Sequence, residues 1–469
     1  MTDRPHLAVI GAGPAGLAAT LAATARGVRV TLIDSAAEAG GQFYRQPAAG
    51  LRARRPQALH HQWRTWERLR DGLRDHLRAG RARHLTDHHV WFVERLSQGF
   101  VVHAMLGPEQ EDPATVHADS VLLATGGYEQ VLPFPGWTLP GVVTAGGAQA
   151  MLKGTIVTPG RVAVVAGTGP LLLPVATGLA EAGVEVTALV ESAHPREFVR
   201  RTRALAAQPA RLAEGTGYAL RLLRHRVRPL LRHTVIEAHG TERVEAVTVA
   251  ALDATGRVRP GTARRIPCDT LAVSHGMLAH TDLAESLGCR LDGVTVQVDD
   301  EQRTDVPGVW AAGEATGIGG SALALAEGHI AGSSAAARLT GTEPDPREWA
   351  AALKSRTKLR EFAAALDAVY RPPVHWGDQV TDETVVCRCE EVSAGAVRAA
   401  VGELGAGDPR TVKLLTRAGM GWCQGRMCAP AVAGLGGCQL GPSRRPFARP
   451  VPLGVLAQEP DHPTEEGPS

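Results

Sequence analysis

Residues 6–34 read HLAVIGAGPAGLAATLAATARGVRVTLID, and this stretch decides the fold of the chain. An apolar run leads into a glycine-rich turn, a helix of small residues follows, and a second apolar run ends in an acid 23 residues after the first glycine. In such a unit the glycines let the backbone approach a pyrophosphate, the helix N-terminus offers free N–H groups, and the acid accepts from a ribose hydroxyl. The stretch therefore predicts a dinucleotide-binding unit. Its expected contact residues are Gly11, Gly13, Gly16 and Asp34.

The same stretch shares one feature with a secretory signal, because residues 6–25 contain no Asp, Glu, Lys or Arg. Cleavage there would destroy the phosphate-binding turn, so we interpret the segment as part of the folded protein. Residues 162–180 are uncharged as well, but glycines and prolines interrupt them, which argues against a membrane span. These observations predict a cytoplasmic protein without a transmembrane segment. They leave open a peripheral contact with the inner face of the membrane.

The composition is that of a globular chain with several domains, since 44% of its 469 residues are hydrophobic and 21% are charged. A net charge of +2 gives no reason to expect nucleic acid as a partner. Arginines concentrate in residues 51–83 and 196–232. We interpret the first of these segments as an amphipathic helix packed on its own domain, with a partner-subunit face as the alternative, and neither segment receives a role. An odd total of seven cysteines argues against a disulfide framework.

Residues 161–191, RVAVVAGTGPLLLPVATGLAEAGVEVTALVE, repeat the pattern of the opening stretch. Gly167 and Gly169 stand in the turn and Glu191 at the acid position, which predicts a second nucleotide-binding-like domain inserted into the first. Leu172 stands where the third glycine belongs, and its side chain would push the helix away from the strand. A site for a second nucleotide and a remnant that only preserves the fold both stay open. Productive use of NAD(P)H is not expected.

Residues 309–332, VWAAGEATGIGGSALALAEGHIAG, return to the first domain. A strand is expected to end before Glu314, whose carboxylate can accept from the ribityl chain of a flavin, and a helix is expected to open at Gly319 and Gly320. A helix N-terminus aimed at a flavin ring can stabilise negative charge on it. Together with the opening unit, this segment makes FAD the expected cofactor.

The late cysteines form a C-x-C pair and a C-x4-C pair across a 33-residue gap. Two such pairs joined by a helical hairpin predict a four-thiolate site, with Ser393 and Asp408 capping the helices and Gly419 as a stop. An iron–sulfur cluster is favoured over structural zinc, because zinc sites usually place two to four residues between paired cysteines. Neither nucleotide-binding unit has a closely spaced cysteine pair, so thiol–disulfide chemistry is not expected. The expected metal ligands are Cys387, Cys389, Cys423 and Cys428.

Several segments together carry a family resemblance over nearly the whole chain: GAGPAG, PFPGWTLPGVVTAGGAQ, AGTGPLLLP, and CRCEE with TRAGMGWCQGRMC. The sequence resembles the large flavin subunit of heteromeric amino-acid dehydrogenases, a family that includes the large subunit of opine oxidase, the middle subunit of hydrogen cyanide synthase, and the alpha subunits of proline and hydroxyproline dehydrogenases. Its cysteine segment resembles the [2Fe-2S] domain of bacterioferritin-associated ferredoxin. The resemblance implies an oxidoreductase subunit that relays electrons, while a smaller partner subunit with its own FAD oxidises an amino acid, imino acid or opine at a CH–NH or CH–NH2 bond.

The resemblance also implies cofactors and partners. FAD is implied, and a second nucleotide (ATP or NAD) or FMN at the subunit interface stays open. Residues 446–456 would contact the partner subunit, while a downstream electron acceptor and a small ferredoxin-like subunit complete the expected partners. No catalytic residue is implied, and Glu314 stands where the family usually has aspartate. The residues carried over for the cofactor are Gly11, Gly13, Ala15, Gly16, Asp34, Gln42, Gly126, Gly313 and Glu314.

The sequence thus predicts an α/β fold with two nested Rossmann-like dinucleotide-binding domains, followed by a small helical-hairpin iron–sulfur domain. Its prolines and glycines make residues 128–149 a crossover rather than a regular element. A self-sufficient NAD(P)H-dependent reductase and a zinc-stabilised module that only scaffolds a complex are the alternative functions. The expected ranges are 1–155 and 281–340 for the first domain, 156–280 for the inserted domain, 341–380 for a helical linker, 381–440 for the iron–sulfur domain and 441–469 for a tail.

Overall fold

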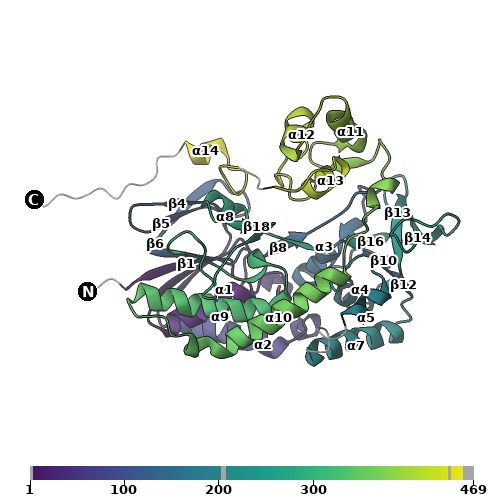
Figure 1. The fold of residues 1–469 in the computed structure, drawn as a ribbon. Helices are drawn as coiled ribbons and strands as arrows, with labels where there is room; N and C mark the ends of the chain where they lie inside the picture. The colour runs from purple at the N-terminus through teal and green to yellow at the C-terminus, as the bar shows by residue number, and fades with distance from the viewer. Residues whose placement is uncertain (1–3, 202–207, 442–444, 458–469) are drawn as a thin grey trace, which may run out of the picture.

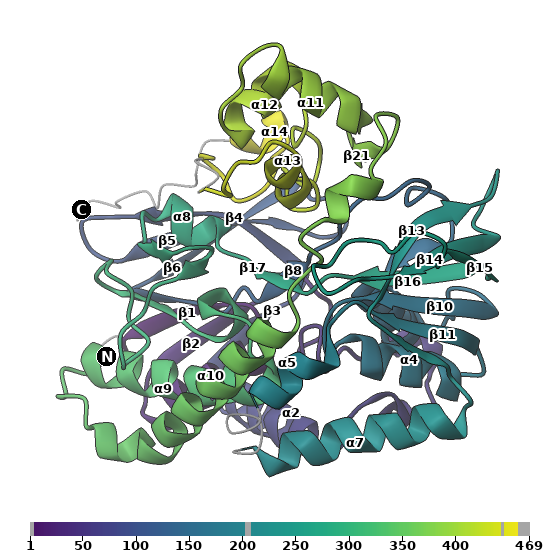
Figure 2. The same ribbon diagram turned by 45° about the vertical axis from the view of Figure 1, so that its right-hand side comes forward.

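A computed structural model describes residues 4–201, 208–441 and 445–457 of the chain. A parallel α/β unit lies beside a second one, and a small C-terminal domain sits above the ribbon that joins them (Figures 1 and 2). The second unit is an insertion in the first, since the chain returns to the first sheet after completing the second. This arrangement confirms the predicted nested α/β fold.

The first sheet is parallel throughout and runs in the order β20-β7-β1-β2-β3. Its central strand β1 is apolar and buried from Leu7 to Ile10, as a strand covered on both faces must be. The strand order reverses between β1 and β7, and ligands of such sheets bind at the carboxyl ends of the strands at this point. Its strands are β1 (His6–Ile10), β2 (Arg29–Ile33), β3 (Ala82–Leu85), β7 (Ser120–Leu123) and β20 (Val309–Ala311).

Helices α1 (Pro14–Ala25) and α9 (Gly320–Leu339) pack on one face of this sheet. They approach so closely that a Cβ atom on Gly328 would lie 2.1 Å from the carbonyl oxygen of Ala15, and one on Gly332 would lie 2.3 Å from that of Ala19. Because these contacts advance in the same direction along both helices, the two helices run parallel. Both N-termini therefore lie at the carboxyl end of the sheet, where α9 begins at Gly320 as expected.

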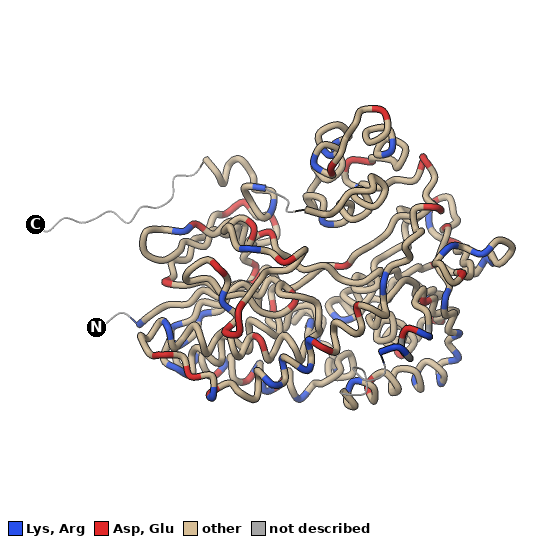
Figure 3. The backbone as a smooth tube through the Cα atoms, in the orientation of Figure 1, with Lys and Arg blue, Asp and Glu red and all other residues tan. Residues whose placement is uncertain are grey.

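The amphipathic helix expected in residues 51–83 is α2 (Trp63–Arg78). It buries Trp66, Leu69 and Leu73 in the core shared with α1, so it packs on its own domain. Figure 3 shows acidic residues interspersed with the basic ones along the lower helices. The other arginine-rich segment, 196–232, forms α5 (Pro195–Arg200), α7 (Pro209–Arg224) and β12 (Pro229–Leu231), and its residues 202–207 lie outside the described residues.

The opposite face of the first sheet is covered by an antiparallel sheet in the order β4-β5-β6 and by α8. Val93, Phe100 and Val102 of this sheet share a core with Ala8 and Ile10 of β1. The elements on this side are β4 (His88–Arg95), β5 (Phe100–Leu106), β6 (Asp112–Ala118), α8 (Asp282–Ser286), β18 (Leu291–Asp292) and β19 (Thr295–Val296).

The second sheet, also parallel, has the order β12-β11-β10-β16-β9 and repeats the first. Its edge strand β9 (Val142–Thr144) lies inside residues 128–149, which we expected to lack regular structure. That expectation was wrong because pairing with β16, remote in sequence, outweighs the prolines and glycines nearby. The second sheet thus begins before residue 156. The other elements here are α3 (Ala145–Ala150), β10 (Val162–Gly167), α4 (Leu172–Glu181), β11 (Glu185–Glu191) and β16 (Thr270–Ser274), with the meander β13 (His233–His239), β14 (Ala246–Ala251) and β15 (Arg264–Pro267).

Two connections join the parts. The antiparallel ribbon of β8 (Gly127–Glu129) and β17 (Met277–Ala279) links the two nucleotide-binding units. Helix α10 (Ala350–Val369) forms half of the expected helical linker, and it lies along α9 rather than standing apart (Figure 1).

The C-terminal domain has its own small core. Ser393 caps α11 and Asp408 caps α12, as predicted, through hydrogen bonds to backbone N–H groups. Helix α12 ends before the expected stop at Gly419, because Arg417 already has a left-handed backbone with a φ of 68°. The elements of this domain and the segment after it are β21 (Val385–Cys387), β22 (Val392–Ser393), α11 (Ala394–Gly402), α12 (Pro409–Thr416), α13 (Ala429–Leu435) and α14 (Leu453–Leu456).

Candidate functional site

The glycine-rich turn after β1 is tightly enclosed by backbone. A Cβ atom on Gly11, whose φ is +107°, would lie 2.2 Å from the carbonyl oxygen of Ala124, and one on Gly16 would lie 1.8 Å from that of Gly11. The loop before Gln42 covers this turn, since Gly40 N–H donates to the Ala12 carbonyl at 2.8 Å. The structure thus brings the predicted turn, the loop of residues 40–42 and the end of β7 together at the carboxyl edge of the sheet.

Asp34 lies at the end of β2 and faces the same turn. Its carboxylate accepts hydrogen bonds from the backbone N–H groups of Ala12 and, at 2.7 Å, of Ala36. The side chain is half-buried, so it remains accessible at the edge of the turn. Asp34 therefore both orders the turn and stands where a ribose acid is needed.

Glu314 lies beside Gly127, the residue that follows Gly126, on the flavin side of the expected site. A Cβ atom on Gly127 would lie 3.5 Å from a carboxylate oxygen of Glu314. Burial raises the pKa of Glu314, and in the described part of the chain no hydrogen bond or ion pair engages its carboxylate. The residue is half-buried, and a carboxylate at this place without a partner in the protein suits an acceptor for a ligand hydroxyl.

Gly313 is held by a residue that the sequence analysis did not single out. Glu327 of α9, which is 0% exposed, accepts from Gly313 N–H at 2.9 Å and from the Thr316 hydroxyl at 3.0 Å. Arg360 of α10 neutralises this carboxylate at 2.5 Å. The sequence gives no local sign that Glu327, in the interior of a helix, holds Gly313 in place, because its partners come from other segments.

Lys153 is a second residue that the sequence analysis missed. It lies in a short π-helix, Met151–Thr155, and its ammonium donates to the Phe43 carbonyl at 3.1 Å, beside Gln42. Burial, helped by Arg45, lowers its pKa to about 8. Gln42 itself accepts from the Arg45 guanidinium at 2.9 Å, so two cationic side chains contact the segment that covers the nucleotide turn.

The second glycine-rich turn is as tight as the first, but the helix after it begins later. A Cβ atom on Gly167 would lie 1.7 Å from the Ser274 carbonyl oxygen, so the tight turn is kept. Helix α4 begins only at Leu172, three residues after Gly169, whereas α1 begins directly after Gly13. The helix N-terminus is therefore set back from the position where a pyrophosphate would sit.

Glu191 serves its own loop in this second unit. Its carboxylate accepts from Gly169 N–H at 3.1 Å and from Ala193 N–H at 2.9 Å, and the residue is only 9% exposed. Burial raises its pKa to about 7. A ribose could reach this carboxylate only after displacing bonds that the protein already makes.

The four late cysteines gather on one side of the C-terminal domain. Cys387 and Cys428 are buried, Cys423 is half-buried and Cys389 is exposed. Cys389 is in hydrogen-bonding contact with Cys423, and Cys428 with Cys387; burial first, and then the neighbouring thiols, raise the pKa values of Cys389 and Cys428. Among the described residues no three His, Cys, Asp or Glu side chains converge as one metal ion would need. Two thiol pairs side by side suit a two-iron cluster, since each iron takes two of them.

Two glycines lie against the four clustered cysteines, where a larger residue would not fit. Gly419 N–H donates to the Cys387 sulfur at 3.4 Å, and a Cβ atom on Gly421 would lie 2.1 Å from the Cβ atom of Cys389. An N–H donor to a thiolate sulfur is one of the contacts that tune iron–sulfur clusters.

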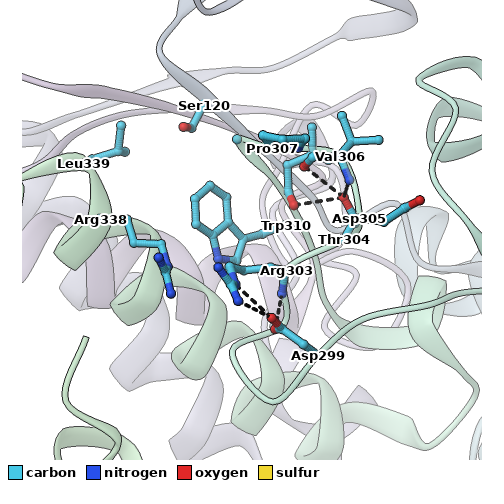
Figure 4. A pocket seen from close by; sticks show the side chains of 12 residues that line it. Ser120, Asp299, Arg303, Thr304, Asp305, Val306, Pro307, Trp310, Arg338 and Leu339 are labelled. Atoms are coloured by element: carbon cyan, nitrogen blue, oxygen red, sulfur yellow. Dashed lines mark hydrogen bonds and ion pairs between the residues drawn. The ribbon is translucent and has the colours of Figure 1, made fainter. Parts of the chain in front are cut away.

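A cavity near the first sheet has another character. It has a volume of about 480 Å³ and is lined by residues such as Ser120, Arg303 and Arg338 (Figure 4). Ser120 and Val309 begin their strands, so the cavity lies at the amino ends and not at the ligand-binding edge. Its cations are paired within the protein, Arg303 with Asp299 at 2.7 Å and Arg338 with Glu301 at 2.8 Å.

Comparison with known families agrees with this geometry. The pyridine nucleotide-disulphide oxidoreductase model matches residues 5–338, and the BFD-like [2Fe-2S] binding domain model matches residues 385–435. The A subunit of opine oxidase from Agrobacterium tumefaciens (strain Ach5) is 33% identical over 448 residues, which cover 92% of this chain and 85% of that protein. The chain belongs to the pyridine nucleotide-disulphide oxidoreductase family. The HcnB subunit of hydrogen cyanide synthase from Pseudomonas aeruginosa is likewise 33% identical, over 90% of each chain.

Family membership indicates the general class of activity and the cofactors. The two matched domains support FAD and a [2Fe-2S] cluster as cofactors of an oxidoreductase, and the relatives are named as subunits. Within residues 5–338 the cysteines are Cys268 and Cys289, which are both buried and 21 positions apart, so this part of the sequence holds no closely spaced cysteine pair despite the family's name. Among the described residues no helix is long and apolar enough to cross a membrane.

A solved structure extends the fold comparison to the whole chain. L-proline dehydrogenase from P. horikoshii matches with a TM-score of 0.65 and 21% identity, over 98% of this chain and 81% of that one. The thioredoxin reductase of Lactococcus lactis matches 72% of this chain with a TM-score of 0.53 and 16% identity. These likenesses show that the two nested nucleotide-binding units are a fold shared with both proteins. The match to L-proline dehydrogenase, which covers 98% of this chain, includes the C-terminal domain as well.

Proposed function

We propose that this chain is the electron-transferring flavin and iron–sulfur subunit of a heteromeric dehydrogenase. A smaller partner subunit with its own FAD oxidises an amino acid, imino acid or opine, and this chain passes the electrons to an external acceptor. One observation carries the proposal: the loop between Cys423 and Cys428 reaches, through Arg426 and Asp282, the segment that is bonded to Gly126 at the nucleotide turn. These bonds link the cysteine loop to the nucleotide turn within one chain, which supports a short path between the two proposed cofactors.

The chain's residues fit the flavin nucleotide. A Cβ atom on Gly11 or Gly16 would collide with the backbone of the first turn, so glycine is required at both positions. The N-termini of α1 and α9 both lie at the same edge of the sheet. Asp34 would hold the ribose, Gly126 and Gly313 would border the ring system, and Glu314 would accept from the ribityl chain. The proposed contact residues are Gly11, Gly13, Ala15, Gly16, Asp34, Gln42, Gly126, Gly313 and Glu314.

The four clustered cysteines fit a [2Fe-2S] cluster. Cys387, Cys389, Cys423 and Cys428 are the proposed ligands, with the exposed Cys389 on the side open to an acceptor. A flavin exchanges one or two electrons and a [2Fe-2S] cluster exchanges one at a time, which is the chemistry that the pair supplies when bound. The protein's own part is to bind both groups, keep them adjacent and hold the N–H donor of Gly419 on the Cys387 sulfur.

The second nucleotide unit receives a structural role in this proposal. Glu191 is engaged by its own loop, and α4 is set back from the turn. A nucleotide such as ATP or NAD could still stabilise the assembly from this side, or FMN could lie at the partner interface, without reducing the flavin. The rival function, a self-sufficient NAD(P)H-dependent reductase, requires that NADH or NADPH reduce the bound flavin at an enzyme's usual rate of about 10 per second.

The decisive experiment compares the chain alone with the chain co-expressed with a smaller FAD subunit. Dye-linked dehydrogenase activity is measured with proline, hydroxyproline, sarcosine, glycine, D-amino acids and opines. We expect activity only in the complex, because the proposal places the amine-oxidising flavin in the partner subunit. Turnover by the isolated chain, or rapid flavin reduction by NADH, would overturn the proposal, and an absence of flavin and cluster absorption would leave only the scaffold alternative.

A further inference from the structure

Asp282, the first residue of α8, is the meeting point of three segments that are far apart in sequence. Only 8% of the residue is exposed. Its carboxylate is contacted by Arg426 at 2.6 Å and by Arg445 at 2.5 Å, on different oxygens. His280 lies 3.0 Å from the oxygen that Arg426 contacts. Burial alone would raise the pKa of Asp282, but His280 and the arginines hold it well below the usual range.

The two arginines come from the C-terminal part of the chain. Arg426 lies in the loop between Cys423 and Cys428, and the next residue, Met427, packs against the core of the second nucleotide-binding unit. One loop of the cysteine domain therefore contacts both units below it. Figure 2 shows α13, which follows this loop, above the β8–β17 ribbon.

Arg445 belongs to residues 445–457, which we name the C-terminal strap. Arg426 also donates to the Ala448 carbonyl at 2.5 Å, and Ala448 N–H donates to the Trp91 carbonyl of β4 at 2.9 Å. The strap is therefore attached both to the cysteine loop and to the flavin domain. Asp282 is the anion that Arg426 of the cysteine loop and Arg445 of the strap share.

Asp282 is coupled to the nucleotide edge through His280, the residue that follows β17. The backbone N–H of His280 donates to the Gly126 carbonyl at 2.9 Å, and the Thr125 hydroxyl donates to the His280 backbone carbonyl at 2.6 Å. Only Thr281 separates this anchored residue from Asp282. The carboxylate is consequently held at a fixed place relative to the turn that follows β7.

We propose that Asp282 is a positioning residue, which holds the cysteine-bearing loop and the C-terminal strap on the flavin domain and so keeps the iron–sulfur cluster beside the nucleotide turn. This inference rests on the proposed electron-transfer function. Its physical reason is that a single buried anion can bind two arginines from different segments only when both segments are docked. Removing the charge leaves two arginines without their shared anion, and the docked state loses the ion pairs that hold both segments at Asp282.

The test uses the full chain with flavin and cluster bound, and the substitution Asp282→Asn. Iron content and cluster absorption should be unchanged, because Asp282 is not a proposed ligand. Hydrogen exchange of the backbone amides in the strap, including Ala448, should become about a hundredfold faster, as expected when a buried ion pair that closes a local opening is broken. The rate at which the cluster is reduced after photoreduction of the flavin should fall.

The control is Asp300→Asn, since Asp300 contacts Arg356 at the same 2.5 Å but its side chain is 87% exposed. We expect no change in exchange of the strap or in cluster reduction. If Asp282→Asn does not fold, Arg445→Met removes one arm of the same contact and should accelerate exchange of the strap alone. Unchanged exchange in an iron-replete Asp282→Asn chain, or in Arg445→Met, would overturn the inference. Failure of the unaltered chain to pass electrons from flavin to cluster would instead refute the proposed function.

Discussion

The substitution Arg360→Met should destabilise the flavin domain from outside the sheet. Glu327 is fully buried, and its carboxylate holds Gly313 and Thr316 while Arg360 neutralises it at 2.5 Å. Methionine keeps much of the apolar stem of the arginine but removes its charge. The glutamate would then be a buried carboxylate that keeps its N–H and O–H donors but has lost its cation.

The size of the effect follows from the burial of both partners. Removing one member of a buried pair costs about 3–5 kcal/mol of unfolding free energy. The Arg360 side chain is 33% exposed, so water replaces part of its effect and we expect a loss near 3 kcal/mol. Burial already raises the pKa of Glu327, and loss of Arg360 raises it further. Because the native state of the variant then binds a proton more tightly than the unfolded chain, its deficit should be smaller at pH 5 than at pH 8.

Urea unfolding followed by circular dichroism measures this loss, with flavin retention as a second readout. The double variant Glu327→Gln/Arg360→Met should recover most of the stability, since no charge is left buried. Arg338→Met is the matched control, because Arg338 pairs with Glu301 at the surface and should cost less than about 1 kcal/mol. An Arg360→Met chain as stable as the control, or a double variant no better than the single one, would refute this reasoning.

Three further predictions concern the cysteines, the helix contact and the second acid. Changing any one of the four proposed cysteine ligands to Ser should remove cluster absorption and iron while flavin remains, and full iron in all four variants would contradict the assignment. Gly328→Ala should prevent stable folding because its Cβ would lie 2.1 Å from a backbone oxygen, whereas Gly178→Ala in α4, which meets only a side-chain carbon at 3.7 Å, should fold normally; equal stability of the two would exclude the close helix contact. Since the pKa of Glu191 is raised to about 7, its contribution to stability is full below pH 4.5 and is lost as pH rises through 7. Urea unfolding should therefore show wild type losing up to about 3 kcal/mol relative to Glu191→Gln over that range, and a constant difference would show that Glu191 is not buried as described.

Local signals carried most of what the sequence could predict. The turn from Gly11 to Gly16 and the acid at Asp34 form one continuous unit whose spacing is fixed by its own backbone, so pattern and structure agree. The caps Ser393 and Asp408 act within three residues of themselves and were equally readable. The absence of the third glycine, at Leu172, also had a visible outcome, since α4 starts later than α1.

Contacts between remote segments could not be predicted in the same way. Strand β9 is three residues long and exists because β16 pairs with it. Glu327 and Arg360 look like ordinary helix residues until α10 is laid along α9. Asp282 appears in the sequence as one acid among many, and its arginines follow more than a hundred residues later. These features depend on tertiary packing, which a single sequence does not display.

The parallel contact of α1 with α9 has a consequence for how the chain is made on the ribosome. Ala15 and Ala19 emerge at the start of synthesis, but the glycines that cover them, Gly328 and Gly332, emerge some 300 residues later. The inserted unit closes its sheet at Ser274 and can fold while the first unit still lacks β20 and α9. During that interval the apolar face of α1 is uncovered in the nascent chain. A chaperone that binds exposed apolar helices would therefore find its substrate near the N-terminus of this protein, although the finished fold buries that helix face.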